Sequence, residues 1–138
     1  MKLHPYLTFN GTCREAFETY AGIFDGEVLF FQHYDEMPGH EDLPKSRLKR
    51  VMHGQVSLQG QVVMGSDTLN PADYLRPQGF QLQTEWEDPD LARDAFAALS
   101  EGGEILMPFE ETFWSPGFGL LRDRFDIMWM VNVNGDGG

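Results

Sequence analysis

Hydrophobic and polar positions alternate along this chain in two blocks that share one order of elements. Residues 3 to 66 and residues 79 to 133 each show a strand pattern, an amphipathic helical pattern and then three more strand patterns. A period of roughly 75 residues is too long for a solenoid repeat, so it indicates a duplicated module whose halves pack on each other. We expect the function of such a protein to lie between its halves.

Both helical stretches have an apolar face and well-marked ends. The first has Thr12 three residues before Glu15, which is the capping-box spacing, and ends at Asp25-Gly26. The second follows Asp88-Pro89 and ends at Gly102-Gly103. The apolar positions recur at steps of three and four residues: Phe17, Tyr20, Ala21 and Phe24 in the first, and Leu91, Ala92, Ala95, Phe96 and Leu99 in the second.

Strand patterns precede and follow each helix. They cover residues 3–9, 27–34, 49–58 and 61–65 in the first block, and 80–84, 104–109, 112–121 and 127–133 in the second. Gln59-Gly60 predicts a tight hairpin. Residues 35–48 are rich in proline, glycine and charge, and this loop is long enough to serve as a flap over a cavity.

These elements predict an α+β fold of two tandem βαβββ modules. Module 1 covers about residues 3–66, an extended linker with Pro71 and Pro77 covers 67–78, and module 2 covers about 79–133. At 138 residues the chain has the length of one domain, so we predict a single domain over residues 1–138.

Composition narrows the location and the partners. The sequence has no apolar run of about 18 residues, so we expect no membrane partner. The N-terminus lacks the features of a secretory signal, and the single Cys13 cannot form an internal disulfide, which together predict a cytoplasmic location. The net charge of −12 repels a phosphate backbone and excludes nucleic acid as an expected partner, while it would attract a cationic ligand.

Several separated motifs resemble one protein family over essentially the whole chain. The motifs are 5–9 (PYLTF), 34–38 (YDEMP), 51–56 (VMHGQV), 62–67 (VVMGSD), 113–119 (FWSPGFG) and 123–132 (DRFDIMWMVN). They resemble the PhnB-like branch of the vicinal-oxygen-chelate superfamily, which contains glyoxalase I, extradiol dioxygenases, and fosfomycin- and bleomycin-resistance proteins.

The resemblance implies a glyoxalase/bleomycin-resistance fold, in which paired βαβββ modules curl their sheets into a cup, usually in a homodimer. It implies no single reaction. Members of the branch have been labelled as similar to a demethylubiquinone methyltransferase. We reject that label for this chain, because Gly102-Gly103 leads into a strand and no glycine-rich turn from a strand to a helix offers a site for an adenosyl cofactor.

The resemblance also implies where a metal would be bound. The superfamily's enzymes hold a divalent metal with His, Gln and Glu side chains on the first and last strands of each module. The matching positions here are His4 to Tyr6 and about Met64 in module 1, and Phe80 or Gln81 and Met130 in module 2. Since a thioether is a poor ligand for such metals, we predict no cofactor and no metal at this site. An altered divalent-metal site built from His53 and His4 is the alternative.

Aromatic residues on or beside the strands suggest walls for a ligand, with polar groups to orient it. We therefore predict a homodimeric protein that binds a small, partly aromatic or cationic molecule, with no catalytic residue assigned. The predicted ligand-binding residues are His53, Tyr34, Gln55, Phe9, Phe80, Trp114 and Trp129.

Two competing function classes remain. One is a metal-dependent lyase, isomerase or dioxygenase with the altered site, whose bound metal would be detected by elemental analysis. The other is an interaction or structural role in which the cup is vestigial. Nucleophilic catalysis is not supported, since Cys13 has no motif around it and Ser66 and Ser115 lack a nucleophile elbow. The carboxylate groups at 85–88 and 110–111 fit solvated strand ends better than a shared-proton pair.

Overall fold

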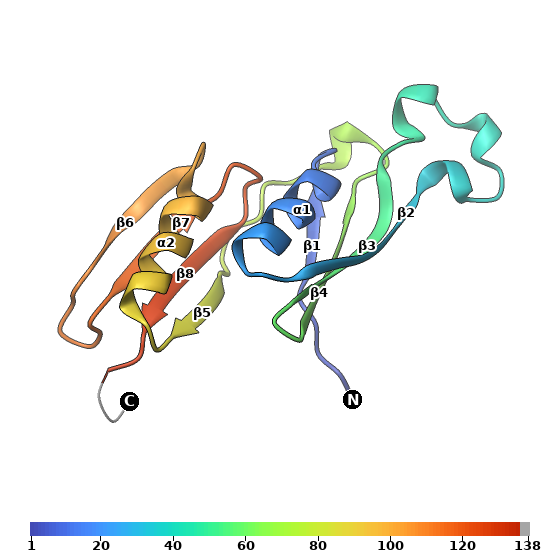
Figure 1. Ribbon diagram of the computed structural model, residues 1–138. Coiled ribbons are helices and arrows are strands. Elements are labelled where there is room, and N and C mark those ends of the chain that lie inside the picture. The colour runs from blue at the N-terminus through green and yellow to red at the C-terminus, as the bar shows by residue number, and fades with distance from the viewer. Residues whose placement is uncertain (136–138) are drawn as a thin grey trace. The chain divides into compact units, whose positions relative to one another are not determined.

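The computed structural model describes residues 1–135 and divides at Leu75 into two units, Met1–Leu75 and Arg76 onward. Each unit consists of a four-stranded mixed sheet with one α-helix on one face, as Figure 1 shows for each by itself. The predicted α+β fold of two βαβββ modules is confirmed, and the two sheets are not closed. No helix among the described residues is long and apolar enough to cross a membrane.

The first unit has the strand order β1-β4-β3-β2. Its strands are β1 (Tyr6–Phe9), β2 (Glu27–His33), β3 (Val51–Leu58) and β4 (Gln61–Asp67). β1 pairs with β4 in parallel, and the other neighbours are antiparallel. The parallel pair forms because the chain passes through α1 (Cys13–Ile23) and two further strands before it returns to β1.

The second unit repeats this topology with the order β5-β8-β7-β6. Its strands are β5 (Leu82–Trp86), β6 (Glu104–Glu110), β7 (Phe118–Arg122) and β8 (Met128–Val133), and its helix is α2 (Pro89–Ser100). β5 pairs with β8 in parallel. β7 starts six residues later than the predicted strand 112–121, because Ser115 is buried as the hydrogen-bonding centre of a tight loop and bonds the carbonyls of Gly117 and Val133.

Each helix packs its apolar face on its own sheet. Under α1, Phe17 contacts Phe9 edge to face, with ring centroids 5.7 Å apart, and both side chains are fully buried. Under α2, Phe96 lies against β6 through Phe109. The predicted apolar positions are buried with two exceptions, since Leu91 is 56% exposed and Ala21 only partly covered.

The two helix starts are stabilised differently. Asp88 caps α2 as predicted, with its carboxylate accepting the amide of Asp90 at 2.8 Å. Thr12 occupies the N-cap position of α1, but its side chain makes no capping bond. The amide of Cys13 instead donates to Asp67 at the end of β4, at 3.0 Å. The predicted capping box is therefore wrong, because a buried carboxylate distant in the sequence takes its place.

The loop between β2 and β3 forms three short 3-10 turns that project beyond the ends of these strands (Figure 1). The turns are Tyr34–Glu36, His40–Asp42 and Lys45–Arg47. A fourth 3-10 turn, Pro71–Asp73, lies in the predicted linker. The role of residues 35–48 as a flap stays a prediction.

Candidate functional site

The face of the first sheet opposite α1, called here the first open face, carries a row of four neighbouring side chains. The strand register places Tyr6 of β1 beside Met64 of β4, Met64 beside Gln55 of β3, and Gln55 beside Phe30 of β2. Partner residues in adjacent strands share one face of a sheet. None of the four side chains carries a formal charge at neutral pH, although the whole chain has a net charge of −12.

His53 lies at the centre of the polar groups on this face. Its Nδ1 is 3.1 Å from the Tyr6 hydroxyl, and its Nε2 is 3.1 Å from Nε2 of Gln55. The Tyr6 ring stacks on the imidazole with centroids 5.7 Å apart, and the Phe30 ring approaches it at the same centroid distance. The structure thus brings together His53 and Gln55, both predicted site residues, with two aromatic rings that the predicted set did not contain.

Alternation along β1 puts Tyr6 and Phe9 on opposite faces, and the packing of α1 decides which of these faces is open. In β1, Leu7 and Phe9 are buried on the helix side, so Tyr6 and Thr8 project from the open face. Phe9 has 0% exposure and contacts Phe17, which leaves it no surface to present to a ligand. The structure therefore places Phe9 in the core of the first unit.

Tyr34 lies at the start of the projecting loop and outside the row. Its hydroxyl donates to the carbonyl of Asp67 at 2.9 Å. Burial raises the pKa of Tyr34, and the nearby Asp67 and Tyr6 raise it further. The phenol therefore stays protonated and keeps its bond to the end of β4 above its ordinary titration range.

The loop that Tyr34 opens is fastened at its base. The ammonium group of Lys49 donates to Asp35 at 2.9 Å and lowers the pKa of that carboxyl group. Arg50 donates to the carbonyl of Thr68 at 2.7 Å and to Asn10 at 2.9 Å. The first contact ties the two ends of the loop together, and the Arg50 contacts tie the loop to the residues that follow β1 and β4.

The second unit has a corresponding row on the face opposite α2. Here Gln83 of β5 lies beside Met130 of β8, followed by Leu120 of β7 and Met107 of β6. The side-chain amide of Gln83 donates to Glu85 at 3.3 Å. Gln83 takes the place that the sequence assigned to Phe80 or Gln81, because β5 begins two residues later than the predicted strand.

The remaining predicted site residues of the second unit are separated. Phe80 is 47% exposed and precedes β5, while Trp114 is half-exposed in the loop before β7, where it contacts Phe118 edge to face. Trp129 is 2% exposed on the helix side, and its indole N–H donates to Asp123 at 2.9 Å. Trp129, a predicted ligand contact, therefore belongs to the core of its unit.

One polar atom of the second open face has no hydrogen-bond partner. The side-chain oxygen of Asn132 is buried and unpaired among the described residues. The strand register places Asn132 between Glu85 and Phe118. Sequence patterns gave no sign of this residue, because an asparagine on a strand has no distinguishing local signal.

Of the four strand positions that the resemblance assigns to a divalent metal, one carries a donor of the expected His, Gln and Glu types, Gln83. Tyr6 and Met64 occupy the pair in the first unit, and Gln83 and Met130 the pair in the second. Two thioethers in such a set do not fit zinc, manganese or iron(II). The altered site is not assembled either, because His4 bonds the carbonyl of Val62 while His53 bonds Tyr6 and Gln55.

Another group of potential metal ligands lies at the end of β2. His33, Asp35 and Glu36 present ligand atoms within 4.8 Å of one another. Each already has a protein partner: Arg14 contacts Nε2 of His33 at 2.7 Å, Lys49 binds Asp35, and Glu36 accepts the backbone amide of His33. This pairing satisfies the three side chains without an ion.

The single thiol is not activated for nucleophilic chemistry. Cys13 is fully buried, and burial raises its pKa, as does the negative charge of Asp67 beside it. Since the thiolate is the reactive form, the structure agrees with the packed thiol expected from the sequence.

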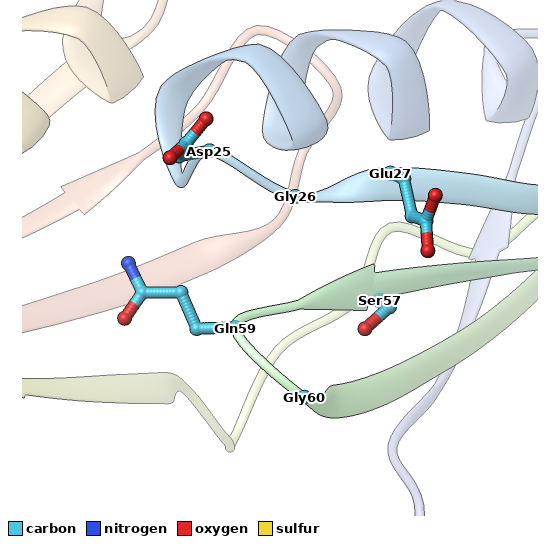
Figure 2. Close-up of a pocket in the computed structure, with 6 residues that line it drawn as sticks. All are labelled: Asp25, Gly26, Glu27, Ser57, Gln59 and Gly60. Atoms are coloured by element: carbon cyan, nitrogen blue, oxygen red, sulfur yellow. The ribbon is translucent and has the colours of Figure 1, made fainter.

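Each unit also has a shallow polar pocket where its helix leads into the next strand. The first, of about 280 Å³, is shown in Figure 2, where Glu27 and Ser57 project from paired positions on β2 and β3. Its lining residues are Asp25, Gly26, Glu27, Ser57, Gln59 and Gly60. The second, of about 230 Å³, is lined by residues that include Arg76, Arg122 and Arg124. Neither pocket is lined by Tyr6, His53 or Gln55.

Comparison with known proteins gives consistent matches over nearly the whole chain. A family model described as 3-demethylubiquinone-9 3-methyltransferase matches residues 1–132. The protein YjdN from Escherichia coli (strain K12) is 32% identical to the chain, over 96% of this chain and 95% of YjdN.

Two solved structures have the same fold at comparable identity. Protein PA1353 from Pseudomonas aeruginosa is 33% identical with a TM-score of 0.84, over 97% of this chain and 98% of that one. A putative 3-demethylubiquinone-9 3-methyltransferase, PhnB protein, from Bacillus cereus is 27% identical with a TM-score of 0.83, over 96% and 99% of the two chains.

Resistance proteins share the fold at much lower identity. The fosfomycin resistance protein FosX from Listeria monocytogenes, solved with Mn(II) and 1S,2S-dihydroxypropylphosphonic acid, is 10% identical with a TM-score of 0.64, over 96% of this chain and 90% of that one. This likeness concerns the fold alone.

Proposed function

Because the chain belongs to the family described as 3-demethylubiquinone-9 3-methyltransferase, the PhnB-like branch of the glyoxalase and fosfomycin-resistance superfamily, we propose that it binds a small, planar, partly aromatic molecule on its first open face. The observation that carries this proposal is the cluster of Tyr6, Phe30, His53 and Gln55. The cluster combines two accessible rings with hydrogen-bonding groups, which is the usual composition of a small-molecule site.

The exposure of the rings supports this proposal. Tyr6 is 50% exposed and Phe30 is 40% exposed. Large apolar side chains that remain accessible beside polar groups are typical of a binding surface rather than of a core. The uncharged row favours burial of a ring over capture of a cation, because it contains no carboxylate to offset a positive charge.

We do not propose methyl transfer, although the family description names it. Along the described residues, the pair Gly102-Gly103 leads from α2 into β6, and the turns from strand to helix contain a single glycine, Gly11. Adenosyl and dinucleotide cofactors of the Rossmann type are bound by a glycine-rich turn from a strand into a helix. The metal-dependent alternative is not favoured, because methionines stand where oxygen or nitrogen donors are needed.

A thermal-shift screen with a library of small aromatic compounds tests the proposed function. At a ligand concentration about 100 times its dissociation constant, binding stabilises the folded chain by about 2.7 kcal/mol, which is a rise of several degrees in melting temperature. We expect Phe30→Ala to abolish the rise for the compounds found. Phe113→Ala is the matched control, since Phe113 is 96% exposed and lies outside the cluster. A library without any stabilising compound would contradict the proposal.

We also propose that the chain forms a homodimer in a cytoplasmic setting. The outer strands β2 and β6 each pair along one edge only within their own sheets, and both expose apolar side chains. Outside the proposed ligand site, these side chains include Leu29, Ile105, Leu106 and Met107. Exposed apolar side chains on an unpaired strand edge favour association with another chain.

Light scattering during size-exclusion chromatography is expected to give about twice the chain mass of 15.7 kDa. Ile105→Lys should weaken the dimer by about tenfold or more, since it places a charge where an apolar group would be buried. Leu91→Lys is the control, because Leu91 is equally exposed but lies on α2. A monomer at every concentration tested would exclude the dimer.

A further inference from the structure

We infer that Gln55, His53 and Tyr6 form a directed chain of hydrogen bonds that ends in a free hydroxyl donor, so that the ligand presents an acceptor oxygen to Tyr6. The ligand class that follows is a planar aromatic compound with a carbonyl or phenolate oxygen. The part of this inference that concerns a ligand rests on the proposed function. The direction of the hydrogen bonds does not depend on the proposed function.

The direction starts at Gln55. Its Nε2 can only donate, and it lies 3.1 Å from Nε2 of His53. The imidazole must therefore offer a lone pair at Nε2. A neutral imidazole with a lone pair at Nε2 carries its hydrogen at Nδ1.

The direction continues to Tyr6. Nδ1 of His53 lies 3.1 Å from the Tyr6 hydroxyl oxygen and must donate to it. The oxygen accepts through a lone pair, which leaves the hydrogen of the hydroxyl for another partner. Tyr6 is 50% exposed on the open face, so this hydrogen is accessible to a bound molecule.

The neighbouring rings keep the imidazole in this orientation. The Tyr6 and His53 rings are nearly parallel, at 23°, while the Phe30 ring is tilted by 51° to the imidazole. A ring turned by half a revolution about its Cβ–Cγ bond would put Cδ2 in the place of Nδ1 and Cε1 in the place of Nε2, and would break both contacts. Hydrogen bonds in series polarise one another, so donation from Gln55 strengthens the donor character of the Tyr6 hydroxyl.

The charge of the chain limits which acceptors fit. A net charge of −12 disfavours approach of a multiply charged anion. A neutral carbonyl or a singly charged phenolate meets the hydroxyl with a smaller electrostatic penalty. The flat ring attached to such an oxygen would lie against Phe30.

The tautomer of His53 tests the direction without any ligand. Long-range proton–nitrogen correlation spectra of the full chain labelled with nitrogen-15 distinguish the two neutral tautomers, and His53→Gln identifies the signal among the four histidines. We expect hydrogen at Nδ1 in the wild type. Gln55→Glu should move it to Nε2, since a carboxylate can only accept. Gln61→Glu adds the same charge at an exposed site away from His53 and should change nothing.

Two probes of similar shape then test the ligand class. Acetophenone has an acceptor oxygen and ethylbenzene has none. Tyr6→Phe should weaken acetophenone binding by about 3- to 10-fold, the value of one hydrogen bond, and leave ethylbenzene unchanged. Far-ultraviolet circular dichroism checks that the variant is folded.

The outcomes separate the two proposals. Hydrogen at Nε2 in the wild type overturns the directed chain, whatever the probes do. Equal weakening of both probes in Tyr6→Phe overturns the acceptor preference. Hydrogen at Nδ1, together with no binding of these probes or of any compound in the library, supports the directed chain and overturns the proposed function.

Discussion

Gly26→Ala and Gly103→Ala are each expected to destabilise the chain by about 3 kcal/mol, the upper range for an added carbon in a closely packed place. The two glycines hold matching positions, where a helix leads into the next strand. A side-chain carbon on Gly26 would collide with the carbonyl oxygen of Ser57, and one on Gly103 would collide with that of Arg122. Backbone atoms held in a sheet cannot move aside cheaply.

Urea unfolding followed by circular dichroism measures both changes. Gly22→Ala is the matched control, since Gly22 lies in α1 and an added carbon meets nothing within 4 Å. That variant should stabilise the chain by about 0.5 to 1 kcal/mol, because alanine loses less backbone entropy than glycine in a helix. Wild-type stability of Gly26→Ala or Gly103→Ala would show that the strands approach less closely than described.

Asp123→Ala is expected to cost about 4 kcal/mol, because it leaves several donors without an acceptor in a buried place. Asp123 is 4% exposed in the turn between β7 and β8. Its carboxylate accepts the amides of Phe125 at 2.8 Å and Ile127 at 3.0 Å. It also accepts the indole N–H of Trp129 at 2.9 Å. One side chain therefore shapes the turn and fixes a core tryptophan.

Asp123→Asn separates the two roles of this carboxylate. The amide oxygen can still accept from the turn, but the amide nitrogen cannot accept from Trp129. We expect about half the loss of stability and a change in tryptophan fluorescence. Asp94→Ala removes a carboxylate from the exposed side of α2 and should change stability by no more than about 0.5 kcal/mol. If Asp123→Ala behaved like Asp94→Ala, the buried bonds would contribute nothing to stability.

Local sequence signals were reliable where a structural feature depends on interactions between residues close together in the sequence. The apolar spacing around Phe17 and Phe96 gave both helices, and Asp88 caps the second one as expected. The β-type segments gave the strands of the described residues with errors of up to three residues at their ends, except that β7 starts six residues late. The failures came where distant groups compete with local ones: Asp67 replaces Thr12 at the start of α1, and Ser115 turns part of a predicted strand into a loop.

The candidate site was predicted only in part, because Tyr6 and Phe30 reach it through strand pairings that the sequence does not reveal. His53 and Gln55 are two residues apart on one strand, so alternation alone places them on one face. Tyr6 is 47 residues from His53 and reaches it only through the parallel pairing of β1 with β4. Phe30 belongs to a strand with irregular register, so its face could not be counted from the sequence.

The sequence by itself determined the duplicated βαβββ framework, the helix faces and the family, since these depend on periodicity and on motifs read along the chain. Only the tertiary structure decided which side chains meet: Tyr6 joins His53, while Phe9 and Trp129 turn into their cores. The physical reason is that a strand has two faces. Which face is open, and which residues of other strands share it, depends on the register of pairing and on where each helix packs.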